Sequence, residues 1–128
     1  MTESGRRRPS ILLVEDDPAG VNALKFSLEL EGFDVSAYAD GESLLASCPL
    51  PETGCLVLDY HLPGMDGLNL LERLRARNVM LPAILITTNP REALRARAAV
   101  AGAPIIEKPL LTDALRDSVL SALGGAAL

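Results

Sequence analysis

Five polar side chains with the chemistry of a metal or phosphoryl site stand at or just after the ends of short apolar runs. They are Glu15, Asp16, Asp59, Thr87 and Lys108. Carboxylates, a hydroxyl and an ammonium group can together bind a divalent cation and stabilise a phosphoryl group in transfer. Lysine is scarce, since Lys25 and Lys108 are the only two in the chain. The placement of Lys108 therefore favours a specific role.

The three carboxylates would repel one another in a shared pocket and raise each other's pKa values. A bound Mg²⁺ resolves this conflict, because it prefers oxygen ligands from carboxylates, water and phosphate. Asp59 could then stay ionised and act as a nucleophile toward phosphorus. Lys108 would offset the charge on the transferring group, and the Thr87 hydroxyl could donate a hydrogen bond to one of its oxygens.

The elements that must position these groups follow from the hydrophobic pattern. Unbroken apolar runs predict strands that are buried on both faces, and helical spacing between them predicts a parallel α/β sheet. The expected strands are 11–14, 33–37, 55–58, 83–86 and 105–106. The expected helices are 18–31, 40–47, 68–74, 90–102 and 112–123, with Asp17, Asp40 and Thr112 as N-caps and Pro90 opening the fourth helix. This pattern predicts five βα units in one domain.

Parallel strands end at the same edge of a sheet, where ligands bind in open α/β folds. Each polar residue has an ordinary explanation by itself. An acidic pair after a strand is often a helix cap, a lone Asp is often a turn residue, and Lys108 could be a solvated charge. We favour a functional site because these explanations would have to coincide at one edge.

Composition excludes several classes of protein. A length of 128 residues suits one domain, and a content of 48% hydrophobic but only 3% aromatic residues predicts an aliphatic core. The net charge of −5 argues against direct nucleic-acid binding, and no apolar run is long enough to cross a membrane. Cys48 and Cys55 lack zinc-site spacing, which favours a reduced, cytoplasmic location. We expect tails at 1–9, with Arg6, Arg7 and Arg8, and at 124–128.

Four segments together resemble a response-regulator receiver domain of two-component signalling. They are ILLVEDD at 11–17, LDYHLPGMDG at 58–67, Thr87, and EKP at 107–109. The resemblance covers about 10–123. It implies a doubly wound, flavodoxin-like (βα)₅ fold with strand order 2-1-3-4-5.

The resemblance also implies a role for each site residue. Asp59 would be the phosphoacceptor, and Asp16, Asp59 and the backbone carbonyl of His61 would hold Mg²⁺, with Glu15 acting through water or assisting. Thr87 would be the switch hydroxyl, and Lys108 would contact the phosphate. The Lys108–Pro109 peptide is expected to be cis.

Three features of the sequence depart from the family pattern or distinguish this chain within it. Ile105 stands where the family has Tyr or Phe, so we expect its side chain to stay packed in both signalling states. Thr88 replaces a very small residue. His61 and Asn89 occupy positions that resemble the family's tuners of phosphoryl lifetime. His61 would contribute only its carbonyl or, in the sharper hypothesis, an imidazole that controls access of water.

The function implied is a stand-alone, phosphorylation-controlled interaction module rather than an enzyme. A sensor histidine kinase or phosphotransfer protein would phosphorylate it. A downstream protein would then read its state, or it would pass the phosphoryl group onward in a phosphorelay. A homodimer could form through helix 90–102, strand 105–106 and helix 112–123, where Arg91, Arg95 and Arg97 lie near acidic residues. Two alternatives are a receiver-like scaffold that needs no phosphorylation and, less favoured, a Mg²⁺-dependent phosphohydrolase.

Overall fold

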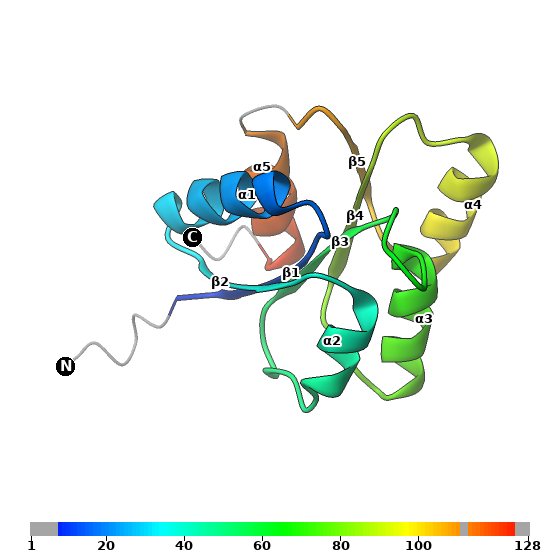
Figure 1. The fold of residues 1–128 in the computed structure, drawn as a ribbon, viewed down its shortest axis with the longest axis horizontal. Helices are drawn as coiled ribbons and strands as arrows, with labels where there is room; N and C mark the ends of the chain where they lie inside the picture. The colour runs from blue at the N-terminus through cyan, green and yellow to red at the C-terminus, as the bar shows by residue number, and fades with distance from the viewer. Residues whose placement is uncertain (1–7, 111–112, 125–128) are drawn as a thin grey trace.

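The computed structural model describes residues 8–110 and 113–124, in which strands and helices alternate along the chain (Figure 1). The strands are β1 (Ser10–Val14), β2 (Asp34–Tyr38), β3 (Cys55–Asp59), β4 (Ala83–Thr87) and β5 (Ile105–Glu107). The helices are α1 (Pro18–Leu30), α2 (Gly41–Ala46), α3 (Gly67–Ala76), α4 (Glu92–Ala101) and α5 (Ala114–Ala122). Each expected element is present, with ends shifted by a few residues at most.

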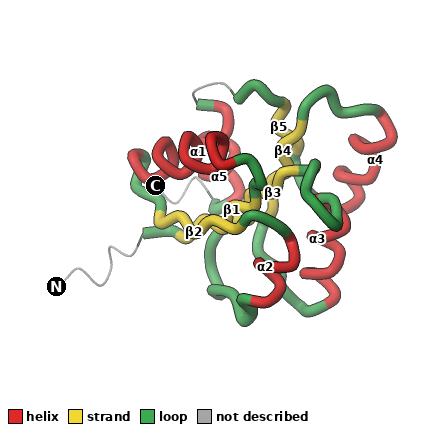
Figure 2. The backbone as a smooth tube through the Cα atoms, in the orientation of Figure 1, coloured by secondary structure: helices red, strands yellow, loops and turns green. Residues whose placement is uncertain are grey.

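The strands form one parallel sheet in the order β2-β1-β3-β4-β5. Helices α1 and α5 cover one face, and α2, α3 and α4 cover the other (Figures 1 and 2). The predicted doubly wound α/β fold and its strand order are therefore confirmed. The order reverses between β1 and β3, which places the carboxyl ends of these strands side by side at the switch point.

The core consists of two aliphatic layers, one on each face of the sheet. Along β1, Leu12 and Val14 belong to the layer under α2, α3 and α4, whereas Ile11 and Leu13 belong to the layer under α1 and α5. This alternation follows from the two-residue period of a strand. Because helices cover both faces of β1, its sequence is an unbroken run of apolar residues.

Side-chain caps set the start of three helices. The backbone N–H groups of Gly20 and Ser43 donate to Asp17 and Asp40, which confirms these two predicted caps. Asp66 caps α3 in the same way. The predicted start of the fourth helix at Pro90 is wrong, because Arg91 has an extended backbone with ψ of 164° and α4 begins at Glu92.

Some predictions lie outside the described residues. Thr112 is one of them, and the described part of α5 begins at Ala114. The proposed tails also fall largely outside, since residues 1–7 and 125–128 are not described. Within the described ranges, no helix is long and apolar enough to cross a membrane.

Candidate functional site

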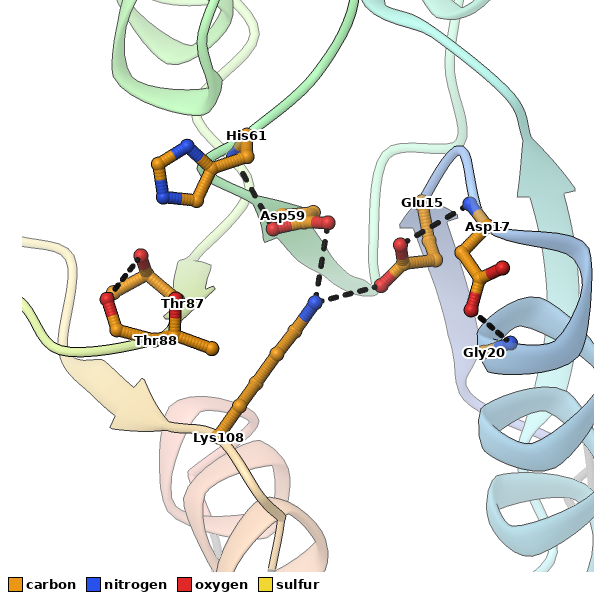
Figure 3. Close-up of polar contacts among 8 residues, drawn as sticks. All are labelled: Glu15, Asp17, Gly20, Asp59, His61, Thr87, Thr88 and Lys108. Carbon is orange, nitrogen blue, oxygen red and sulfur yellow. Dashed lines mark hydrogen bonds and ion pairs between the residues drawn. The ribbon is translucent and has the colours of Figure 1, made fainter.

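The carboxyl edge of the sheet brings the five predicted side chains together, and Figure 3 draws four of them, Glu15, Asp59, Thr87 and Lys108. Glu15 follows β1, Asp59 and Thr87 end β3 and β4, and Lys108 follows β5. Glu15, Asp59 and Thr87 are 3%, 2% and 1% exposed, and they are the buried polar residues of the described chain. Burial of polar groups is unfavourable without partners, so the contacts of these groups indicate what the site is built to do.

Lys108 joins the two buried carboxylates. Its Nζ lies 3.3 Å from Glu15 Oε1 and 3.2 Å from Asp59 Oδ2. Burial opposes the charged ammonium, but the two carboxylates outweigh this effect and raise the pKa of Lys108. The lysine is therefore held as a cation between the strands.

The pKa of Glu15 depends both on its burial and on its neighbours. Burial, followed by the hydrogen bond with Asp59 and the charge of Asp59, raises its pKa. The backbone N–H of Asp17, 3.3 Å from Glu15 Oε2, and the charge of Lys108 act in the opposite direction. The raised pKa is the mark of like charges placed close together in a buried site.

The Asp59 carboxylate is held by a different donor on each oxygen. Oδ2 accepts from Lys108, and Oδ1 accepts from the backbone N–H of His61 at 3.2 Å. The loop after Asp59 returns to the strand, since Gly67 N donates to Tyr60 O at 2.9 Å. The loop therefore contributes a fixed backbone donor to the carboxylate. The sequence predicted roles for the carbonyl and the imidazole of His61, but not for this backbone N–H.

Three carboxylates could share a metal ion. Glu15, Asp16 and Asp59 each offer an oxygen, and these oxygens lie within 4.8 Å of one another. Asp16 is exposed, so one side of the cluster is open to solvent. A set of carboxylate oxygens with room for water suits a hard divalent cation such as Mg²⁺.

Thr87 lies on the other side of Asp59, at the wall of a separate cavity. Its hydroxyl donates to the Thr88 carbonyl oxygen at 3.2 Å. The cavity has a volume of about 410 Å³, and its lining includes Tyr60, His61, Thr87, Asn89, Arg91 and Arg97. The sequence reasoning named several of these residues without placing them in a common cavity.

The positions that depart from the receiver pattern can also be located. Ile105 is half-buried and packs against the layer that contains Leu94. Asn89 adopts a left-handed backbone with φ of 44°, and the His61 ring meets the Tyr60 ring edge-on at 5.0 Å. The Lys108–Pro109 peptide is cis, as predicted. Whether Ile105 keeps its packing on signalling, and whether the His61 imidazole controls water, stay predictions.

Two proteins of similar sequence are named as transcriptional regulatory proteins. FixJ of Bradyrhizobium diazoefficiens, a transcriptional regulatory protein, is 33% identical over 114 residues, which cover 88% of this chain and 56% of FixJ. The C4-dicarboxylate transport transcriptional regulatory protein DctD of Pseudomonas aeruginosa is 39% identical over 114 residues, or 88% of this chain and 25% of DctD. This chain thus spans about half the length of FixJ and a quarter of DctD.

A solved structure and a family model also match this chain. A CheY-like response regulator receiver domain protein from Methanospirillum hungatei superposes with a TM-score of 0.85 at 27% identity, covering 94% of this chain and 98% of that one. The sequence model of the response regulator receiver domain matches residues 11–120. Because this match includes most of the chain, the protein belongs to the response regulator receiver domain family of two-component signalling.

Proposed function

We propose that this chain accepts a phosphoryl group on Asp59 from a sensor histidine kinase or a phosphotransfer protein and signals through a protein partner. The observation that carries the proposal is the environment of Asp59. Its carboxylate is buried at the sheet edge, and its two oxygens accept from Lys108 and from the His61 N–H. A nucleophile held in one orientation is ready for in-line attack on phosphorus.

The residues around Asp59 have complementary parts in this reaction. An Asp59 oxygen forms the new bond to phosphorus while the bond from phosphorus to the donor breaks. The Lys108 ammonium, 3.2 Å from Asp59 Oδ2, offsets negative charge on the transferring group. The Thr87 hydroxyl, now donating to Thr88, can rotate to donate to a phosphoryl oxygen.

The acidic cluster fits Mg²⁺ as the cofactor of this reaction. Asp16, Asp59 and the His61 carbonyl would hold the ion, with Glu15 assisting, because carboxylate and carbonyl oxygens are its preferred ligands. When bound, Mg²⁺ would supply positive charge that offsets the repulsion between the carboxylates and the incoming phosphoryl group.

Phosphoryl labelling tests the proposal. Incubation with Mg²⁺ and a small phosphodonor should add the mass of one phosphoryl group to the parent, whereas Asp59→Asn should gain none. Asp40→Asn changes the N-cap of α2, which is not one of the site residues, and should be labelled like the parent. An unlabelled parent would instead support the scaffold, and sustained turnover of phosphomonoesters would support the phosphohydrolase.

The cellular setting is also part of the proposal. We infer a receiver that works in the cytoplasm, with output through protein contacts rather than through binding of nucleic acid. The relatives named above are transcriptional regulators, so the alternative is output through an attached domain. The mass and the cell fraction of the native protein would distinguish the two arrangements.

A homodimer through α4, β5 and α5 stays a prediction. Several of the charges that suggested it pair within the chain, since Arg95 lies 3.6 Å from Glu107 and Arg116 lies 2.9 Å from Asp117. A dimer that uses these charges would have to replace the ion pairs within each chain by ion pairs between the two chains. Each exposed pair contributes little to stability by itself. Light scattering with and without beryllofluoride tests it, and a monomer in both conditions would contradict it.

A further inference from the structure

The cavity beside Asp59 is separate from the acidic cluster. The β3–α3 loop forms one wall with Tyr60 and His61, and the β4–α4 loop and α4 form the other. In Figure 3, His61, Thr87 and Thr88 lie on one side of Asp59, while Glu15 and Asp17 lie on the opposite side. Thr87 lines the cavity and lies on this side of Asp59, so a group bound to phosphorus at Asp59 can extend toward the cavity, away from the carboxylates.

Two arginines are among the residues that line the cavity, in a chain whose net charge is −5. Arg91 and Arg97 line it, and no carboxylate is among its lining residues. Arg97 is already engaged, since it lies 3.9 Å from Glu72 and 3.5 Å from the Asn69 side-chain oxygen. Within the described residues, the Arg91 guanidinium has no hydrogen bond or ion pair.

Local stability does not explain Arg91. It occupies the N-cap position of α4 without a side-chain cap hydrogen bond. Ser, Thr, Asp and Asn are preferred there, and a cation near a helix N-terminus is unfavourable. Arg91 thus departs from the capping preference of a helix start, close to the reactive Asp59. Such a departure suggests a role in function.

We propose that this cavity binds the carboxylate leaving group of a small acyl phosphate, with Arg91 as the residue that selects it. The inference rests on the proposed function of Asp59. An Asp59 oxygen bonds to phosphorus, the bond from phosphorus to the acyl oxygen breaks, and its electron pair leaves on the carboxylate. A guanidinium binds a carboxylate through two parallel hydrogen bonds, so Arg91 would bind this product more strongly than a neutral one.

Two phosphodonors with different leaving groups test the proposal. Acetyl phosphate releases a carboxylate, whereas phosphoramidate releases neutral ammonia. In Arg91→Ala, the second-order rate constant of labelling by acetyl phosphate should fall about tenfold, as expected for loss of a hydrogen bond to a charged group. Labelling by phosphoramidate should stay unchanged.

A matched variant separates this effect from general attraction of anions. Arg73→Ala removes the same charge from the exposed side of α3, and Arg73 does not line the cavity. It should leave both rate constants unchanged. Arg91→Lys keeps the charge but loses the paired donors, so it should recover only part of the rate with acetyl phosphate.

The outcomes distinguish this inference from the proposed function. Equal losses with both donors would mean that Arg91 acts on the phosphoryl group, and no loss with either would mean that it does not contact the donor. Both results overturn the leaving-group site but leave Asp59 as the phosphoacceptor. A parent labelled by neither donor would overturn the two proposals together.

Discussion

At the scale of single residues, the site is a balance of buried charges. Lys108 is the one cation in contact with the carboxylates of both Glu15 and Asp59 in the described chain. When both carboxylates are ionised, the ammonium neutralises only one of them. The remaining negative charge is buried, which is unfavourable for stability. The same excess of negative charge favours a divalent cation. The arrangement is therefore explained better by reactivity than by stability.

The two cysteines should differ sharply in reactivity. Burial raises the pKa of the Cys55 thiol to about 12, and its side chain is fully buried in the layer under α1 and α5. Cys48 is only partly buried, in the stretch after α2. Because the thiolate is the reactive form, iodoacetamide at a pH of about 8 should label Cys48 in the folded protein and Cys55 only after denaturation.

Peptide mass mapping before and after denaturation checks this prediction. Cys48→Ser provides the control, since it should leave the folded protein unlabelled. Labelling of Cys55 under native conditions at a rate like that of Cys48 would contradict the observed packing of β3.

At the scale of elements, the β3–α3 connection fixes the nucleophile. Asp59 ends β3, and Gly67 begins α3 directly against the Asp59 backbone. Asp66 caps the helix by accepting from Asn69 N at 2.7 Å. The helix start and the strand end are thus in contact, although a whole loop of sequence separates Asp59 from Gly67. This contact positions the loop that supplies the His61 N–H.

A methyl group at position 67 should disturb this contact. The Cβ of Gly67→Ala would lie 2.5 Å from the Asp59 carbonyl oxygen and 2.9 Å from Leu85 Cδ1. We expect a loss of about 1–3 kcal/mol in the free energy of unfolding, as for other overpacked sites. Phosphoryl labelling of Asp59 should slow as well. Denaturant unfolding and donor labelling measure the two effects.

Gly102→Ala is the control for backbone strain without a clash. Gly102 follows α4 with φ of 72°, and nothing lies within 4 Å of the place that an alanine Cβ would take. Its free energy of unfolding should fall by about 1–2 kcal/mol because of the left-handed backbone alone, and phosphoryl labelling of Asp59 should stay normal. A Gly67→Ala protein with the stability and labelling of the parent would show that the loop can move freely.

At the scale of the whole molecule, the sheet separates two aliphatic layers. Leu74 on α3 belongs to one layer, and Ile11 on β1 belongs to the other. Both side chains are fully buried. The site residues stand at the carboxyl ends of strands that are packed between the two layers. Their positions therefore depend on both layers.

The two layers should contribute to stability independently. Leu74→Ala should lower the free energy of unfolding by about 2–5 kcal/mol, and Ile11→Val should lower it by about 0.5–1.5 kcal/mol, because each substitution leaves a cavity in a packed layer. Their effects should add in the double variant, since the sheet lies between the two sites. Urea unfolding of the parent, the two single variants and the double variant tests additivity. A clear coupling energy would indicate that the sheet transmits strain between its faces.

The local pattern of the chain determined most of the fold. Runs such as 55–58 predict buried strands because both faces of such a strand need apolar side chains. The caps at Asp17 and Asp40 were predictable because they depend on residues three positions apart. The common edge for Glu15, Asp59 and Lys108 followed from a general property of parallel sheets. These features need no knowledge of individual distances.

Only the tertiary structure decided how the groups meet. The His61 N–H on Asp59 depends on the path of a loop, and the joint contact of Lys108 with Glu15 and Asp59 depends on three strand ends. The cavity with Arg91 forms between two loops whose sequences contain no shared pattern. The physical reason is that hydrophobic periodicity specifies which face of an element is buried. Distances between loops instead follow from packing of the whole chain.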